Sequence, residues 1–167
     1  MRRVEADIRQ PSLCTGAEIA AFCDLVRQGE EVDPRGLEDR AKRAKALVLL
    51  FVDRTLAGVA ALKRPARTYR DGVFQKAGVP NAAKSFDLEL GWVFVPKVHR
   101  GKQYSRVLSA AALSQNERLP TFATTRADNM AMQRTLEHLA FRRLGDSWRS
   151  SRGKREWLVL YVSVPGK

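Results

Sequence analysis

The pattern of apolar and polar residues predicts helices and strands mixed along the 167-residue chain. A loose alternation over residues 1–10 predicts a first edge strand, and apolar residues at helical spacing predict helices over 16–27 and 33–45. The continuous apolar run 46–52 has the length of a strand, and a short turn separates it from a second strand over 56–62. These two strands predict an antiparallel hairpin.

Cap and turn residues mark the ends of these elements. The segment 12–15 offers N-caps for the first helix, and Gly29 is expected to end that helix. Residues 64–85 are polar, basic and interrupted by proline and glycine, so they predict a long connection that contains Tyr69. Long connections in compact domains are usually functional or mobile.

The strand predicted over residues 86–95 has the clearest alternation in the chain. One face carries Phe86, Leu88, Leu90 and Trp92, and the other carries Asp87, Glu89, Gly91 and Val93. The remaining pattern predicts, in order, a helix over 104–115, a strand over 120–125, a helix over 129–139, a strand over 141–144, a polar loop over 145–155 with Trp148, and a strand over 157–164. The order of elements predicts one α/β (α+β) domain over residues 1–167 with a mixed sheet.

Composition agrees with a soluble, cytoplasmic, globular protein. Apolar residues make up 44% of the chain and charged residues 29%, which is too apolar for a disordered chain. No apolar run reaches the length of a membrane span, and the charged N-terminus leads into no signal core. Cys14 and Cys23 are too few for a disulfide scaffold and have no metal-ligand partners nearby, so we expect reduced cysteines and no metal.

The charge of the chain is its most unusual bulk property. Thirty Lys and Arg residues face 18 acids, a net charge of +12. Such a field attracts phosphates, nucleotide cofactors, nucleic acids and acidic partners, and it does not distinguish among them.

The most informative local chemistry is a basic turn between a strand and a helix. The start of a helix carries unpaired N–H groups and partial positive charge, which favour phosphate. Arg100 and Lys102 add formal charge there, and Gly101 lets the backbone approach a ligand. This arrangement predicts a diphosphate-binding turn, and the alternative is a turn with solvated basic side chains.

Two segments in the order and spacing of one family resemble its motifs. Residues 89–102, ELGWVFVPKVHRGK, resemble the core acetyl-CoA-binding motif of the GNAT superfamily of N-acetyltransferases. Residues 129–141, NMAMQRTLEHLAF, resemble the second motif, in which an Asn opens a helix that ends in Leu-Gly-Phe. The resemblance covers residues 86–144. It implies a GNAT-like fold with a mixed central sheet flanked by helices, and acetyl transfer from acetyl-CoA to a primary amine.

The resemblance also implies roles for individual positions. Glu89 occupies the strand position that often supplies the general base in this family. Such a base is needed because a protonated amine must lose a proton before it attacks a thioester. The alternative is that Glu89 is a carboxylate on the solvent face of the strand. Asn129 would hydrogen-bond the cofactor arm. The backbone would hold the pantetheine at Val93, Phe94 and Val95, and the diphosphate at Arg100, Gly101, Lys102, Gln103, Tyr104 and Ser105.

The chain departs from the family's pattern at several positions. Gln103 stands where a glycine is expected. Ala140 replaces the glycine of the second motif, which should cost little unless the backbone there needs a positive φ. Leu136 stands where many members carry a tyrosine that protonates the leaving thiolate, and a leucine cannot do this. Tyr69 is a candidate for that acid. His99 and His138 are interpreted as surface or cap residues rather than bases.

The acceptor is the least defined partner. The resemblance implies a small-molecule or protein amine and is compatible with a homodimer. Acidic residues within 30–39 could attract a cationic amine, and the favoured alternative is a solvated helix end.

Basic runs in 64–85 and 142–156, interleaved with aromatic residues, leave open a nucleic-acid-associated protein. The aromatic residues in question are Tyr69, Phe74, Trp148 and Trp157. A GNAT-like fold that binds acyl-CoA without efficient catalysis is a further alternative.

Overall fold

The structure is a computed structural model that describes residues 1–152 and 156–166. The chain divides into two compact units. The first consists of Met1–Arg64 and Leu90–Gln115, and the second of Pro65–Glu89 and Asn116–Lys167.

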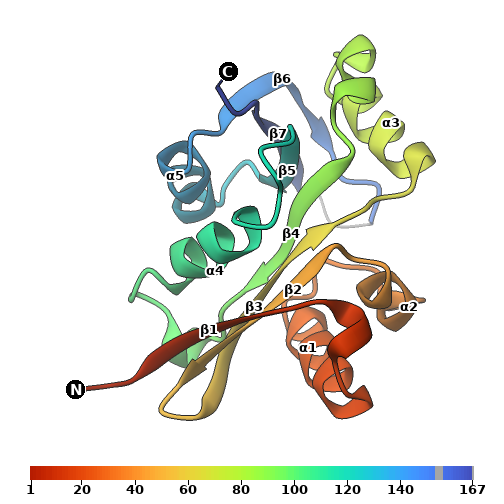
Figure 1. Cartoon of the computed structure of the whole chain (residues 1–167). Helices are drawn as coiled ribbons and strands as arrows, with labels where there is room; N and C mark the ends of the chain where they lie inside the picture. Colours follow the sequence, from red (N-terminus) through yellow and green to blue (C-terminus); the bar gives the residue numbers. More distant parts are fainter. Residues whose placement is uncertain (153–155, 167) are drawn as a thin grey trace. The chain divides into compact units, whose positions relative to one another are not determined.

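Within the described residues, seven strands form one mixed sheet in the order β1-β2-β3-β4-β5-β7-β6 (Figure 1). The strands are β1 (Val4–Arg9), β2 (Ala46–Val52), β3 (Thr55–Lys63), β4 (Leu88–Phe94), β5 (Thr121–Arg126), β6 (Arg142–Arg149) and β7 (Trp157–Ser163). The α-helices are α1 (Gly16–Gln28), α2 (Leu37–Lys42), α3 (Arg67–Lys76), α4 (Tyr104–Leu113) and α5 (Met130–His138). The 3₁₀ helices are η1 (Pro11–Leu13), η2 (Pro80–Ser85) and η3 (Lys97–His99). None of the helices in this part of the chain is long and apolar enough to cross a membrane.

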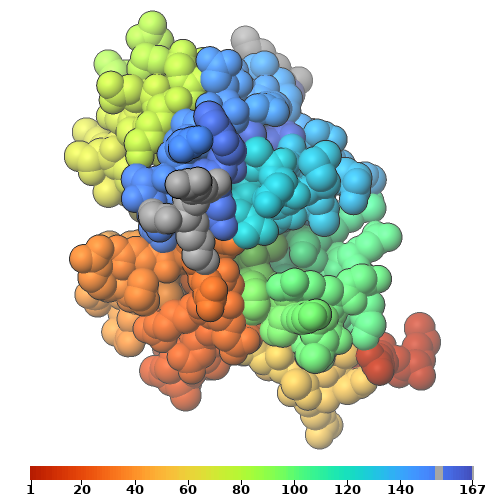
Figure 2. Space-filling model, turned by 180° about the vertical axis from the view of Figure 1, so that it is seen from behind, coloured from red at the N-terminus to blue at the C-terminus, as the bar shows by residue number. Residues whose placement is uncertain are grey.

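The first unit is built around the predicted hairpin. β2 pairs antiparallel with β3 and with the edge strand β1, which confirms both predictions. The continuous apolar run of β2 reflects burial on both faces, because α1 and α2 cover one face of these strands and α4 covers the other (Figure 1). In Figure 2, α1 and α2 (orange) lie side by side at the surface of this unit.

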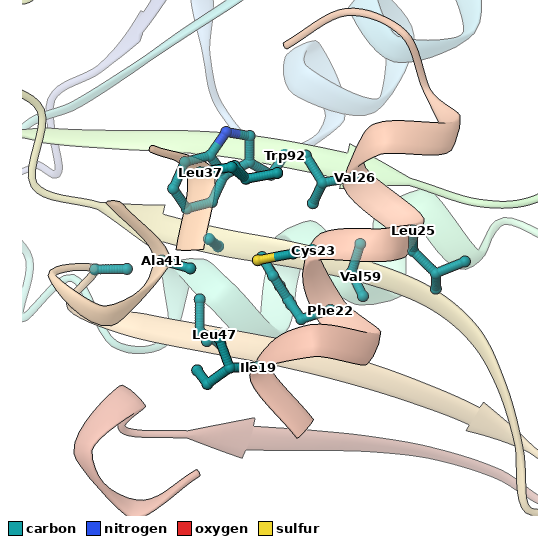
Figure 3. Packing of buried hydrophobic residues seen from close by; sticks show 12 residues of the cluster. Ile19, Phe22, Cys23, Leu25, Val26, Leu37, Ala41, Leu47, Val59 and Trp92 are labelled. Atoms are coloured by element: carbon teal, nitrogen blue, oxygen red, sulfur yellow. The ribbon is translucent and has the colours of Figure 1, made fainter. Parts of the chain in front are cut away.

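The core of the first unit lies between α1, α2 and the sheet (Figure 3). Phe22 and Cys23 of α1 pack with Leu37 of α2 and with Val59 of β3. Trp92 of β4 completes the cluster with its ring edge-on to Phe22, at 6.0 Å between centroids and an angle of 74°. Offset or edge-on aromatic pairs of this kind add stability beyond the area they bury.

The first helix begins and ends at the predicted residues. Thr15 is its N-cap and forms a reciprocal capping box with Glu18. Gly29 is the C-cap but has a right-handed φ of −69°, and the left-handed residue is Glu30, with φ of +55°. Gly29 is instead close to the Phe94 ring, which a Cβ at this position would approach to 3.1 Å. Its role is therefore close packing rather than chain reversal.

The second unit contains the largest correction to the predicted elements. The expected long connection 64–85 contains a ten-residue helix, α3, followed by the 3₁₀ turn η2. Val73 and Phe74 of α3 pack against Phe122 of β5 and Leu160 of β7. Two apolar residues were too few to show a periodic signal in so basic a segment. α5 covers the other face of these strands (Figure 1).

The ends of two further elements also differ from the prediction. α2 begins at Leu37 rather than Asp33, because Asp33 forms a turn in which its carboxylate accepts from the Arg35 amide at 2.9 Å. β6 extends to Arg149 and includes Trp148, so the predicted polar loop 145–155 is wrong over its first part. A shift in the β6–β7 register between Leu144 and Trp148 explains why a strict alternation does not reveal this strand.

Candidate active site

Glu89 is the chemically distinctive residue of β4. It is only 3% exposed, so the alternative of a carboxylate on a solvent face is wrong. β4 runs parallel to β5 here, with Leu88 opposite Thr121 and Glu89 opposite Phe122. A carboxylate at such a buried position needs hydrogen-bonding partners.

Tyr69, the third residue of α3, provides one such partner. Its hydroxyl donates to Oε1 of Glu89 at 3.1 Å, and the Thr124 side chain on β5 also hydrogen-bonds the phenol. The residue as a whole is 44% exposed, but its hydroxyl end lies away from water. Loss of hydration first, and the neighbouring Glu89 next, raise the pKa of Tyr69, which keeps the phenol protonated. The structure therefore brings the two predicted catalytic residues together within the second unit.

β4 changes its backbone conformation three residues after Glu89. Trp92 has φ of +52°, which is rare for a bulky residue and costs energy. Its ring packs against Phe22, and the Lys63 ammonium lies over the ring, 4.6 Å from the ring centroid. A left-handed residue within a strand interrupts regular pairing and redirects the backbone groups that follow. The redirected backbone groups are the N–H and C=O groups of Val93, Phe94 and Val95.

The Lys63 side chain reaches Trp92 by crossing the backbone at Gly91. A Cβ on Gly91 would lie 2.7 Å from Cδ of Lys63. Gly91 therefore leaves the space through which this lysine passes, which the sequence did not indicate.

The turn after β4 uses part of its hydrogen-bonding capacity internally. The Arg100 amide donates to Lys97 O at 3.2 Å, and its Nε donates to Val95 O at 2.9 Å. Arg100 thus braces the turn against β4, and the Val95 carbonyl is engaged. The exposed glycine at position 101 has φ of +79° and open space around it. This leaves the backbone from Gly101 to Ser105 as the surface suited to an anion.

α4 begins directly at this turn. Gln103 is its N-cap, and the first helical bonds run from the Arg106 and Val107 amides to Gln103 O. The Tyr104 and Ser105 amides belong to the first helical positions, which have no carbonyl to bind within the helix. Tyr104 itself is buried, so its side chain supports the helix start. Helix-start amides, a helix dipole and Lys102 together suit a diphosphate.

Gln103 adopts the conformation that a glycine would adopt more easily. Its φ is +59°, and left-handed backbone costs an L-residue about 1–2 kcal/mol. We expect Gln103→Gly to raise the free energy of unfolding by about 0.5–1 kcal/mol, since the gain is partly offset by glycine's greater entropy when unfolded. Chemical denaturation measures this difference.

Lys102→Gly is the matched control for this substitution. Lys102 is exposed like Gln103, but it is not among the residues with positive φ. Gly at this position should leave stability unchanged or lower it. A Gln103→Gly variant that is less stable than the parent protein would show that the Gln103 side chain contributes more than its backbone strain costs.

Asn129 lies at the start of α5, in the second unit. Its Oδ1 accepts from the Met132 amide at 3.1 Å, so the side chain caps the helix. The capping interaction uses the oxygen and leaves the Nδ2 donor for a ligand. The capping role and the expected contact with a cofactor arm are therefore compatible.

The departures in the second motif have structural consequences. Leu136 is fully buried in the core and cannot serve as an acid. Ala140 has φ of +65°, so the backbone keeps a left-handed conformation although glycine is absent. Tyr161 is buried, and its hydroxyl lies 3.1 Å from Gln133 Oε1 and 3.2 Å from Glu137 Oε1. This bonding joins β7 to α5 and gives Tyr161 a structural role.

The aromatic residues proposed for nucleic-acid stacking divide into two groups. Phe74 and Trp148 belong to the core of the second unit, so the prediction that they stack on bases is wrong. Tyr69 is committed to Glu89, and Trp157 is 47% exposed with the Arg149 guanidinium 5.5 Å above its ring. Lys154 and Arg155 of the basic run 142–156 lie outside the described residues.

The acidic residues before and within α2 are partly engaged in local ion pairs. Asp33 pairs with Arg35 at 2.7 Å, and Glu38 pairs with Lys42 at 3.1 Å. These contacts match the reading of a solvated helix end.

The fold is shared with solved structures of the GNAT family of acetyltransferases. No protein-family model matches the chain, and no curated protein matches it. A GNAT-family acetyltransferase from Streptococcus agalactiae aligns with a TM-score of 0.66 at 14% identity, over 97% of this chain and 96% of that chain. YncA from Salmonella typhimurium, solved with its cofactor acetyl-CoA, aligns with 0.68 at 16% identity, over 98% and 95%.

A third solved structure has the same fold. The ribosomal-protein-S18-alanine N-acetyltransferase from Escherichia coli aligns with a TM-score of 0.67 at 11% identity, over 100% of this chain and 96% of that chain. These similarities confirm the predicted GNAT-like fold. At sequence identities this low, the similarities define the fold of the chain and do not identify its acceptor.

Proposed function

We propose that this chain transfers an acyl group, most readily acetyl, from acetyl-CoA to a primary amine by direct attack in a ternary complex. The observation that carries the proposal is the hydrogen bond between Tyr69 and the buried Glu89 on β4. An acid and a base in contact, on the strand that precedes an anion-binding turn, match the needs of amine acylation. The shared fold with acetyltransferases supports the same reading.

The cofactor would be held along the chain that follows Glu89. Val93 and Phe94 offer half-buried backbone beyond the left-handed Trp92, and the Gly101–Ser105 backbone offers donors at the start of α4. Asn129 offers its Nδ2. Acetyl-CoA would supply a thioester whose acyl carbon is open to attack by an amine.

Glu89 and Tyr69 would move the protons of the reaction. Glu89 accepts the proton that the ammonium group of the acceptor must lose, and the free amine then forms the C–N bond while the C–S bond breaks. Tyr69, kept protonated by its raised pKa, gives its proton to the leaving sulfur. Glu89 can return its proton to Tyr69 through their hydrogen bond, so one of the two protons that the ammonium nitrogen loses ends on the thiol. The second, lost from nitrogen as the amide forms, passes to solvent.

Binding of acetyl-CoA is the first test of this function. We expect calorimetric titration to show binding of acetyl-CoA and of desulfo-CoA that survives moderate salt, because the turn supplies fixed backbone donors as well as charge. A short oligonucleotide serves as the comparison ligand. Absence of CoA binding, together with salt-sensitive oligonucleotide binding, would favour the nucleic-acid alternative.

Catalysis is tested separately by screening amines. Acetyl-CoA binding without turnover on any small amine or protein terminus would favour an acyl-CoA-binding protein instead. The net charge of +12 and the basic residues of the second unit favour acceptors with acidic groups in such a screen.

A further inference from the structure

The contact between Tyr69 and Glu89 depends on where the first turn of α3 lies, and that turn has little stabilisation of its own. Its N-cap is Ala66, which has no side-chain cap hydrogen bond, and its first turn carries no acidic residue. Such helix starts leave amides unsatisfied and fray readily. The apolar anchors of α3, Val73 and Phe74, lie one turn further along the helix.

A second polar contact joins the same turn of α3 to the start of β4. Arg70 follows Tyr69 directly, and Asp87 precedes Glu89 by two residues. The Arg70 Nη1 donates to Oδ1 of Asp87 at 2.6 Å. Arg70 is only 6% exposed, which is unusual for an arginine, whereas the Asp87 side chain is 82% exposed, so the guanidinium reaches from a buried position to a carboxylate at the surface.

Arg70 has another carboxylate partner that does not link the two elements. Its Nε donates to Oδ1 of Asp71 at 2.9 Å, and Asp71 is the next residue of α3 itself. The Asp71 contact can therefore neutralise Arg70 but cannot hold α3 against β4. Of these two contacts of Arg70, the one with Asp87 joins α3 to the start of β4.

We infer that the Arg70–Asp87 ion pair is a positioning device that holds Tyr69 on Glu89. Arg70 acts through Tyr69 and does not itself contact the reacting groups. The expected effect on turnover rests on the proposed function. The position of Tyr69 does not, and it can be measured without any substrate.

The test compares Asp87→Asn with Asp71→Asn. Both substitutions remove one carboxylate charge from Arg70 and leave the other, so the guanidinium stays paired in each. NMR of protein labelled with ¹³C at tyrosine Cζ follows the ionisation of each tyrosine, and Tyr69→Phe identifies the signal of Tyr69. We expect Asp87→Asn to lower the pKa of Tyr69 toward the ordinary range of a tyrosine, and Asp71→Asn to leave it raised.

Turnover provides the second readout. We expect kcat to fall about tenfold or more in Asp87→Asn, because a displaced Tyr69 no longer takes part in proton transfer. We expect little change in kcat in Asp71→Asn. An unshifted Tyr69 signal in a folded Asp87→Asn protein would overturn the inference, as would equal shifts in both variants. If Asp87→Asn does not fold, Arg70→Lys, which keeps the charge and loses the planar guanidinium geometry, is judged by the same Tyr69 signal.

The two possible failures can be told apart. If Tyr69 shifts as expected but no amine is acylated by the parent protein, the positioning role stands and the proposed function is wrong. If the parent protein is active and Tyr69 does not shift, the proposed function stands and the positioning role is wrong.

Discussion

Glu89→Gln is expected to lower the turnover of amine acylation by about a hundredfold or more, while acetyl-CoA binds almost as before. The amide of glutamine has the shape of the carboxylate and can still accept from the Tyr69 hydroxyl, so the buried site keeps its packing. It cannot take a proton from the acceptor ammonium. The effect should therefore appear in kcat, with the affinity for acetyl-CoA measured by calorimetry as the internal reference.

Glu38→Gln is a suitable control for this substitution. Glu38 is a half-exposed carboxylate on α2 that pairs with Lys42, so its loss removes a charge from the protein without touching the candidate site. Turnover in this variant should match that of the parent protein. A parallel loss of turnover and acetyl-CoA affinity in Glu89→Gln would contradict the assignment of Glu89 as the base and indicate a role in shaping the site.

Gly145→Ala is expected to lower the free energy of unfolding by about 3 kcal/mol, from left-handed strain and overpacking together. Gly145 has φ of +72°, and a Cβ there would lie 2.2 Å from the Ala77 carbonyl oxygen. That carbonyl also accepts from the Asp146 amide at 2.8 Å. The alanine would force β6 away from the C-cap of α3 and break this hydrogen bond.

Gly72→Ala supplies the matched control within the same unit. Gly72 lies in the middle of α3, and a Cβ there meets no atom within 4 Å. We expect this variant to gain about 0.5–1 kcal/mol, because alanine is the better helix former. Both variants are measured by urea denaturation. Equal stabilities for Gly145→Ala and the parent protein would show that the β6 backbone can shift without cost.

The order of elements could be predicted from the sequence wherever burial leaves a periodic trace. The apolar run of β2 and the alternation of β4 are such traces, and both strands are present as predicted. α3 could not be predicted, since it is anchored by two apolar residues, a buried arginine and a tyrosine rather than by a repeating apolar stripe.

The candidate site shows a similar limit. Glu89 could be identified from its place in a motif. Its burial could not, because its partner Tyr69 comes from α3, a helix that the sequence did not predict. Thr124 and Asp87 were missed, and no local signal marks them: each acquires its contact only when distant segments meet. The alanine at 140 was expected to be of little consequence unless its φ was positive, and the structure shows that φ is positive.

The order of the strands also bears on how the protein avoids aggregation. β1 and β6 are the outer strands of the sheet among the described residues, and outer strands offer unpaired backbone groups to other chains. β6 exposes Arg142, Arg143 and Arg149, and β1 carries charged side chains between its apolar ones. Charged residues on an outer strand oppose the approach of a second strand in water. Like-charge repulsion between the arginines of β6 therefore opposes edge-to-edge pairing of two copies of this strand.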